Sequence, residues 1–254
     1  MSLYSAIQFT SVSFLYASAS NLGDFQFLFI DLALILPIAI FMGWTGPYPV
    51  LSKKRPTASL VSRKVLVPLL GQIVICVLTQ LVGWEIVQRQ PWYQPPVLDK
   101  EHSNSENSQN TTLFLVSCFQ YILSAIVLSV GPPFRQSMTQ NRRSILTFAD
   151  NNTFANIFTV PFVITMVTAV GISAYMLFDP APWLVSLMEL TDMSSSFRIF
   201  ILVLATGGFA CSYLAERVVF PPLAKWIGKA NAKLRPSHQK KRKEYKLIAE
   251  SMRI

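Results

Sequence analysis

The sequence predicts an all-α membrane protein, a polytopic bundle of six transmembrane helices. First, 52% of the 254 residues are hydrophobic and only 14% are charged, which is unlike an ordinary soluble domain. Second, the apolar residues gather in six blocks, each near the length that crosses a bilayer. Third, the net charge of +9 comes mainly from basic residues between and after these blocks, as expected of cytosolic loops.

The six predicted spans occupy residues 1–222, and a basic cytosolic tail occupies residues 223–254. The first span is the most polar, because it contains several serines together with Gln8 and Thr10. Such a helix is tolerated inside a bundle better than against lipid, so we expect it in the interior. The predicted spans in order are residues 3–19, 25–44, 66–86, 113–130, 157–178 and 197–219.

The charges of the loops predict the orientation of these spans. Basic residues concentrate in the loops after the second and fourth spans, whereas the loops after the third and fifth spans are mainly acidic. By the positive-inside rule the basic loops are cytosolic, and both ends of the chain are then cytosolic as well. The basic residues are Lys53, Lys54, Arg55, Arg63, Lys64, Arg135, Arg142 and Arg143; the acidic ones are Asp99, Glu101, Glu106, Asp179, Glu189 and Asp192.

The second span carries an acidic residue, Asp31, inside an apolar run that continues to Phe41. A carboxylate at membrane depth is costly, so it usually faces a partner, a cavity or a cation path. Asp31 is therefore the first candidate for a substrate site. Pro37 either kinks this helix and frees a carbonyl for substrate, or is simply tolerated there, and the sequence leaves both readings open.

The chain contains no recognisable catalytic, cofactor or metal motif. A Walker-type phosphate loop, His-Glu-x-x-His, Gly-x-Ser-x-Gly and cysteine pairs at metal spacing are all missing from the sequence. The two histidines, His102 and His238, lie in polar segments and offer no base at membrane depth. We therefore expect no catalytic residue, no metal, no bound cofactor and no nucleic-acid partner, and this chain should not hydrolyse ATP alone.

Two further features concern the outside face and the membrane surface. The sequon Asn110-Thr-Thr112 falls in a predicted outside loop, so close to the fourth span that glycosylation can be blocked sterically. Trp226 is predicted to anchor at the headgroups, and the basic run Lys240-Lys-Arg-Lys243 either binds anionic lipid or only fixes the orientation. No signal peptide precedes the first span, so either that span directs insertion or the chain begins mid-protein.

The sequence resembles the C-terminal membrane half of P5B-type ATPases, the family of lysosomal and vacuolar polyamine-transporting P-type pumps. The resemblance covers essentially the whole chain and is most specific in the second span. It is carried by Leu22-Gly-Asp-Phe-Gln-Phe-Leu-Phe-Ile-Asp31, Leu3-Tyr-Ser-Ala-Ile-Gln-Phe9, Gly46-Pro47, Arg55-Pro56, Gln90-Pro-Trp92, Ser117-Cys-Phe-Gln-Tyr121 and Gly131-Pro-Pro-Phe-Arg135.

The resemblance implies that the six spans correspond to the fifth to tenth core helices of a P-type ATPase. It places the phosphorylation and nucleotide domains, including the segment Asp-Lys-Thr-Gly-Thr, upstream of Met1 in a longer parent that uses ATP and Mg²⁺. On this interpretation the chain is a C-terminal fragment, a truncated gene product or the result of internal initiation. Its partners are then the missing N-terminal catalytic half, membrane lipid and an organic cation.

The resemblance also implies a substrate route lined by Tyr4, Gln8 and Asp31. The physical chemistry agrees, because Tyr4 and Gln8 are four residues apart and share one helix face. An aromatic ring attracts an ammonium group and an amide oxygen accepts its N–H bonds, while Asp31 supplies charge pairing. Asp24 and Gln26 belong to the same motif and complete the predicted site, although Asp24 at the outer helix start can equally be a solvated carboxylate.

The predicted function is therefore the membrane portion of an ATP-driven P5B cation or polyamine transporter. It would line the pathway from lumen to cytosol in a late endosomal, lysosomal or vacuolar membrane. Two alternatives stay open: a stand-alone six-helix channel or carrier, and a non-catalytic membrane interaction subunit. A metal cation as substrate also stays open, although few oxygen ligands are visible for one.

Overall fold

The computed structural model describes residues 2–43, 48, 50, 61–96, 104–129, 134–135 and 159–234. These residues are mostly helical, and no β-strand occurs among them, in agreement with the predicted all-α class. The chain divides into two compact units. The larger comprises Met1–Pro56 with Gln72–Tyr213, and the smaller comprises Thr57–Gly71 with Leu214–Ile254.

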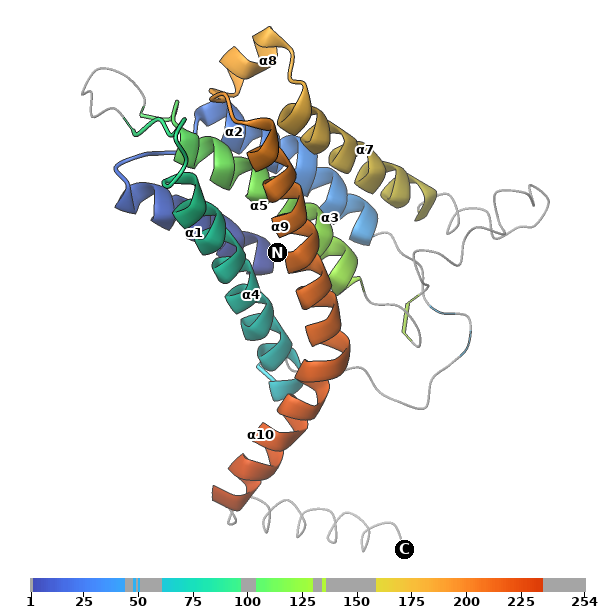
Figure 1. Cartoon of the computed structure of the whole chain (residues 1–254). Helices are drawn as coiled ribbons and strands as arrows, with labels where there is room; N and C mark the ends of the chain where they lie inside the picture. The colour runs from blue at the N-terminus through green and yellow to red at the C-terminus, as the bar shows by residue number, and fades with distance from the viewer. Residues whose placement is uncertain are drawn as a thin grey trace, which may run out of the picture. The chain divides into compact units, whose positions relative to one another are not determined.

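The helices follow the predicted spans closely along the chain (Figure 1). The second span is three consecutive segments, because its central part is a π-helix (η1) with wider hydrogen bonding than the α-helices on either side. The last span likewise passes through a π-helix (η3) into a further α-helix. The elements are α1 Ser2–Ala17, α2 Asp24–Leu28, η1 Phe29–Ile35, α3 Leu36–Gly43, α4 Arg63–Val87, α5 Ser108–Leu128, α7 Thr159–Phe178, α8 Pro182–Leu187, α9 Ser195–Leu214, η3 Ala215–Val219 and α10 Phe220–Leu234.

Three helices in the described part of the chain are long and apolar enough to cross a membrane. They are Arg63–Val87, Ser108–Leu128 and Ser195–Ala230, and Thr165–Phe178 is a shorter apolar helix. The prediction of six spans is thus confirmed for three by length and composition. The first predicted span corresponds to a helix of 16 residues, and the second is divided by the change of hydrogen bonding at η1.

Helix α5 lies at the centre of the larger unit, with α1, η1 and α7 packed against it (Figure 1). Four consecutive residues of α5 have no exposed surface, so neighbouring segments cover the helix on all sides over this turn. They are Leu113, Phe114, Leu115 and Val116. Polar side chains on α5 are buried as well and need hydrogen-bond partners, which Thr112 and Ser117 find in carbonyls of their own helix and Gln120 finds on α4. The centre of this unit is therefore held by both apolar packing and interhelical hydrogen bonds.

Glutamine side chains provide several of these interhelical bonds. The Gln80 amide donates to the Gln120 side-chain oxygen at 2.9 Å, and Gln120 donates to the Cys76 carbonyl at 3.0 Å, which connects α4 with α5. Gln72 on α4 donates to the Ser212 carbonyl on α9 at 3.1 Å. Buried polar groups inside a helix bundle are commonly satisfied in this way. These glutamines accordingly have structural roles.

Close contact between α4 and α9 depends on Gly208. A Cβ atom at this position would lie 3.0 Å from the Thr79 hydroxyl oxygen, whereas one at Gly207 would meet nothing within 4 Å. In the smaller unit the ring of Phe220 occupies the space that a side chain at Gly71 would need. Small residues thus allow close approach at Gly208 and Gly71, but Gly207 has no such role.

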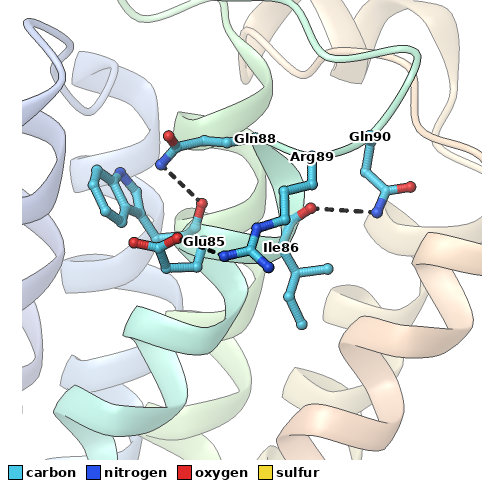
Figure 2. Close-up of polar contacts among 6 residues, drawn as sticks. Glu85, Ile86, Gln88, Arg89 and Gln90 are labelled. Carbon is cyan, nitrogen blue, oxygen red and sulfur yellow. Dashed lines mark hydrogen bonds and ion pairs between the residues drawn. The ribbon is translucent and has the colours of Figure 1, made fainter.

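The C-terminal end of α4 is capped by local side-chain hydrogen bonds (Figure 2). Gln88 donates to the Trp84 carbonyl at 3.1 Å and Gln90 to the Ile86 carbonyl at 3.3 Å. Such side chains satisfy carbonyls that the last helical turn leaves without partners. Arg89 and Glu85 form an exposed ion pair at 3.5 Å, which contributes at most about 1 kcal/mol in water.

Several features singled out in the sequence lie outside the described residues. Because these include half of the charged loop residues named above, the orientation of the spans stays a prediction. They are Gly46-Pro47, Lys53, Lys54, Arg55-Pro56, Asp99, Glu101, His102, Arg142, Arg143, His238 and the run Lys240–Lys243.

Candidate functional site

Asp31 has a partner on the neighbouring helix, as the cost of a carboxylate at membrane depth demands. The Tyr4 hydroxyl on α1 donates a hydrogen bond to Asp31 Oδ1 on η1. Gln8, one turn further along α1, also interacts with the Tyr4 hydroxyl. The structure therefore brings together three of the residues that the sequence assigned to a substrate route. Asp31 itself is exposed within the described part of the chain.

The backbone around Asp31 departs from regular α-helix. The N–H of Leu36 bonds to the Asp31 carbonyl, five residues back, and the π-helix η1 ends at Ile35, two residues before Pro37. Because proline has no N–H and clashes with the carbonyl four residues earlier, a regular α-helix is disfavoured at this point. The π-helix η3 likewise ends at Val219, two residues before Pro221. Single π turns often occur at functional sites, and this one carries the candidate carboxylate.

A second tyrosine, Tyr121 on α5, completes an aromatic pair with Tyr4. The ring centroids are 5.5 Å apart and the planes are tilted by 54°. Tyr121 is only 3% exposed, and its hydroxyl makes no well-aligned hydrogen bond among the described residues, although the Ser117 side chain of its own helix lies close to it. Buried tyrosine hydroxyls normally find a partner, so this one marks a place where a polar group of a ligand or water fits.

A cavity of about 350 Å³ adjoins the tyrosine pair, between α1, the η1–α3 segment and α5. From Tyr121 to Leu128 along α5 it extends for about 10 Å, at 1.5 Å per helical residue. Near its far end Arg135 donates to the Met42 carbonyl at 3.3 Å. The volume is in the range that holds a small organic molecule. Most of the wall is apolar: Leu3, Ile7, Ile35, Ile38, Ala39, Met42, Ala125 and Leu128, with Tyr4, Tyr121, Ser124 and Arg135 as the polar members.

Comparison with known proteins decides the family. No protein-family model matches this chain. The chain is, however, 41% identical over 256 residues to the vacuolar cation-transporting ATPase YPK9 of Saccharomyces cerevisiae. This alignment covers 100% of the chain and 15% of the yeast protein. It is 34% identical over 224 residues to the polyamine-transporting ATPase 13A2 of Homo sapiens, covering 86% of the chain and 17% of that protein. It is 40% identical over 163 residues to the polyamine-transporting ATPase 13A3 of Homo sapiens, and this alignment covers 56% of the chain and 13% of that protein.

The chain is homologous to one region of the P5B ATPases. It spans only 15% of the yeast protein and 17% of human 13A2, so these relatives are much longer than the part compared. The P5B resemblance expected from the sequence is confirmed by these identities. The long apolar helices further indicate that the chain resembles a membrane region of these ATPases.

The remaining P5B motif residues lie apart from the Tyr4–Asp31 pair. Asp24 is the exposed first residue of α2, about 10 Å along the helix axis from Asp31. Gln26 is fully buried, where it donates to the Met188 carbonyl at 2.6 Å and accepts from the Gly23 N–H at 3.2 Å. Its amide thus joins α2 to the segment after α8. The substrate roles assigned to Asp24 and Gln26 stay predictions.

Sequence reasoning missed Tyr121, Ser124 and Arg135 as cavity residues. Tyr121 stands in the quoted segment Ser117–Tyr121, and a tyrosine within an apolar span was the available signal, because its hydroxyl needs a partner. Ser124 and Arg135 gave no such signal. Within the described ranges no three His, Cys, Asp or Glu side chains lie close enough together to hold a metal ion.

Proposed function

We propose that this chain lines part of the substrate pathway in an ATP-driven P5B pump for polyamines or related organic cations. The observation that carries the proposal is the hydrogen bond between Tyr4 and Asp31 beside an apolar cavity. The homology to ATPases whose names specify polyamine or cation transport supports the same class of substrate.

The chemistry of the site suits an amine that carries apolar spacers. An ammonium group pairs with the Asp31 carboxylate through a charge-assisted hydrogen bond, and a carboxylate has lone pairs beyond the one that Tyr4 uses. The rings of Tyr4 and Tyr121 attract a cation through their faces. The apolar wall of Ile35, Ile38 and its neighbours then accepts the methylene chain, whose burial is favourable.

A metal ion suits this site less well. Hard cations such as Ca²⁺ are coordinated by roughly six to eight oxygen ligands. In the described residues the site offers the oxygens of Asp31, Tyr4, Gln8, Tyr121 and Ser124, and Asp31 is the only anionic side chain among these five. An organic cation needs fewer ligands and gains from the apolar cavity, so we favour it as the substrate class.

The energy for transport would come from the parts of the parent pump that bind ATP and Mg²⁺. In this proposal the chain supplies only the membrane pathway, with both its ends cytosolic and transport directed from a vacuolar or lysosomal lumen to the cytosol. The alternatives of a stand-alone channel or carrier and of an interaction subunit gain no support from the relatives, since those named above are all ATPases.

The test replaces Asp31 by asparagine in the full-length ATPase that contains this chain. A hydrogen bond to a charged group is worth about 1.5–3 kcal/mol, so we expect the polyamine concentration for half-maximal ATPase stimulation to rise about 10- to 100-fold. Asp192→Asn is the matched control, because Asp192 is an exposed aspartate in a loop. Unchanged stimulation of the Asp31→Asn protein, with normal membrane insertion, would exclude Asp31 from the site.

A further inference from the structure

Helix α10 prolongs α9 and η3 into one helical run that is longer than a membrane crossing requires. The helical run Ser195–Ala230 has 36 residues, well above the roughly 20 that cross a bilayer. The hydrocarbon core of a bilayer is about 30 Å thick, and the 20 residues of α9 already match it. The residues of α10 therefore lie beyond the hydrocarbon core if α9 crosses it.

The two faces of α10 have different chemical character. Lys225 and Lys229 are four residues apart, so they share one face, and both are exposed. Leu223 is 39% and Trp226 is 67% exposed; the helical period places Trp226 next to the lysine face and Leu223 about 60° further round, on the far side of Trp226. An exposed apolar strip next to a basic face is the pattern of helices that lie in a membrane interface.

The rest of the helix is already occupied within its own unit. Phe220 is only 5% exposed and packs against Gly71 at the start of α4. A Cβ atom at Gly228 would lie 3.1 Å from Arg63 Nη1, so this side of α10 also faces α4. Among the described residues, Leu223 and Trp226 are the large apolar side chains of α10 that stay uncovered.

The positive charge of this segment favours an anionic binding partner. From Arg217 to Lys243 the sequence contains no acidic residue, so the lysines of α10 have no carboxylate nearby in the chain. Pro221 and Pro222 follow the π-helix η3, and prolines without N–H groups permit a change of helix direction. The helix can therefore turn along a surface after α9 leaves the hydrocarbon core.

We propose that α10 binds the anionic lipid surface of the membrane that α9 crosses. Trp226 and Leu223 enter the headgroup region, and Lys225 and Lys229 pair with lipid phosphates and carboxylates. The proposal uses the membrane orientation given under Proposed function but does not depend on the identity of the transported cation. A basic residue near an anionic surface contributes about fivefold in binding, so the two lysines together contribute about 30-fold.

The test uses the full chain reconstituted in lipid nanodiscs, either of phosphatidylcholine alone or with about a quarter phosphatidylserine, a fraction chosen to give a strongly anionic surface. A nitroxide label at position 226, introduced as Trp226→Cys in a Cys211→Ser background, reports depth through its accessibility to oxygen and to a water-soluble nickel complex. Cys76 and Cys118 are buried and should not react. We expect the label to be shielded from the nickel complex in anionic discs and much less so in neutral ones.

The double variant Lys225→Gln/Lys229→Gln should remove this dependence on lipid charge, while Arg89→Gln at the other end of α4 should not. Hydrogen exchange of α10 in the unlabelled chain provides a second measurement that does not alter Trp226, with slower exchange expected in anionic discs. Equal accessibility and equal exchange in both lipid compositions would overturn the proposal. Protection that is equally strong in neutral discs would also overturn it, because apolar insertion alone would then account for the contact.

Discussion

The Tyr4 hydroxyl on α1 donates its hydrogen bond to the Asp31 carboxylate on η1, joining two residues that are 27 positions apart in the chain. The pair lies at the point where the π-helix departs from regular α-helix, next to the cavity between α1, η1–α3 and α5. A carboxylate in this place is costly without a partner. Tyr4 therefore supplies the partner that this carboxylate requires, and under the proposed function it would also contact a cation that binds Asp31.

Replacing Tyr4 by phenylalanine should separate these two contributions. The aromatic face stays, but the hydrogen bond to Asp31 is lost, so we expect the free energy of unfolding to fall by about 1–3 kcal/mol. Thermal unfolding in detergent would measure this. Because Asp31 is then available to the ammonium group without competition, polyamine affinity should be unchanged or higher. A large loss of affinity would mean that the Tyr4 hydroxyl itself binds the substrate.

Gln26→Leu tests whether this buried residue is structural. The change removes the donor to the Met188 carbonyl and the acceptor for the Gly23 N–H, so the protein should lose about 1–3 kcal/mol of stability. Gln88→Leu is the control, because Gln88 bonds only to the Trp84 carbonyl of its own helix. Unaltered stability of Gln26→Leu, together with weakened polyamine stimulation, would instead indicate that Gln26 binds substrate.

Gly71→Ala tests the packing of the smaller unit. The added methyl group would occupy the position of the Phe220 ring, and overpacking of this kind costs about 1–3 kcal/mol. Gly207→Ala is a matched control within a helix, since a Cβ atom there would meet nothing within 4 Å. Equal melting temperatures for the two variants would contradict the contact between Gly71 and Phe220.

The sequon at Asn110 should carry no glycan in cells. Asn110 has no exposed surface, and its amide nitrogen donates to the Ser105 carbonyl at 2.5 Å within the first turn of α5. An oligosaccharide on that fully buried nitrogen has no space. Treatment with an endoglycosidase should leave the gel mobility unchanged, as should Asn110→Gln. A mobility shift on enzyme treatment that Asn110→Gln abolishes would show that the site is used.

The sequence predicted where the apolar helices lie better than how the last helix continues. The apolar blocks located α4 and α5 within a few residues, because length and hydropathy depend on local composition. The continuation of α10 to Leu234 was not foreseen, since Pro221 and Pro222 and the lysines that follow are typical of a tail. An amphipathic face becomes evident only when the segment is known to be helical.

The site was predictable only in part, for a physical reason. Tyr4, Gln8 and Asp31 could be assigned because a charged residue in an apolar run demands a partner, and the family motif named its neighbours. The burial of Gln26 depends on Met188, which is 162 residues away in the chain, so no local pattern reveals it. The cavity depends on how α1, α3 and α5 pack together, which periodicity alone does not specify.

The most direct test of the central claim is equilibrium binding of radiolabelled spermine to the purified full-length ATPase and to its Asp31→Asn variant. We predict saturable binding to the wild-type protein, displaced by other polyamines but not by Mg²⁺ or Ca²⁺, and about 10- to 100-fold weaker binding to the variant. Equal affinity of the two proteins, or displacement of spermine by a divalent metal at comparable concentration, would contradict an organic-cation site at Asp31.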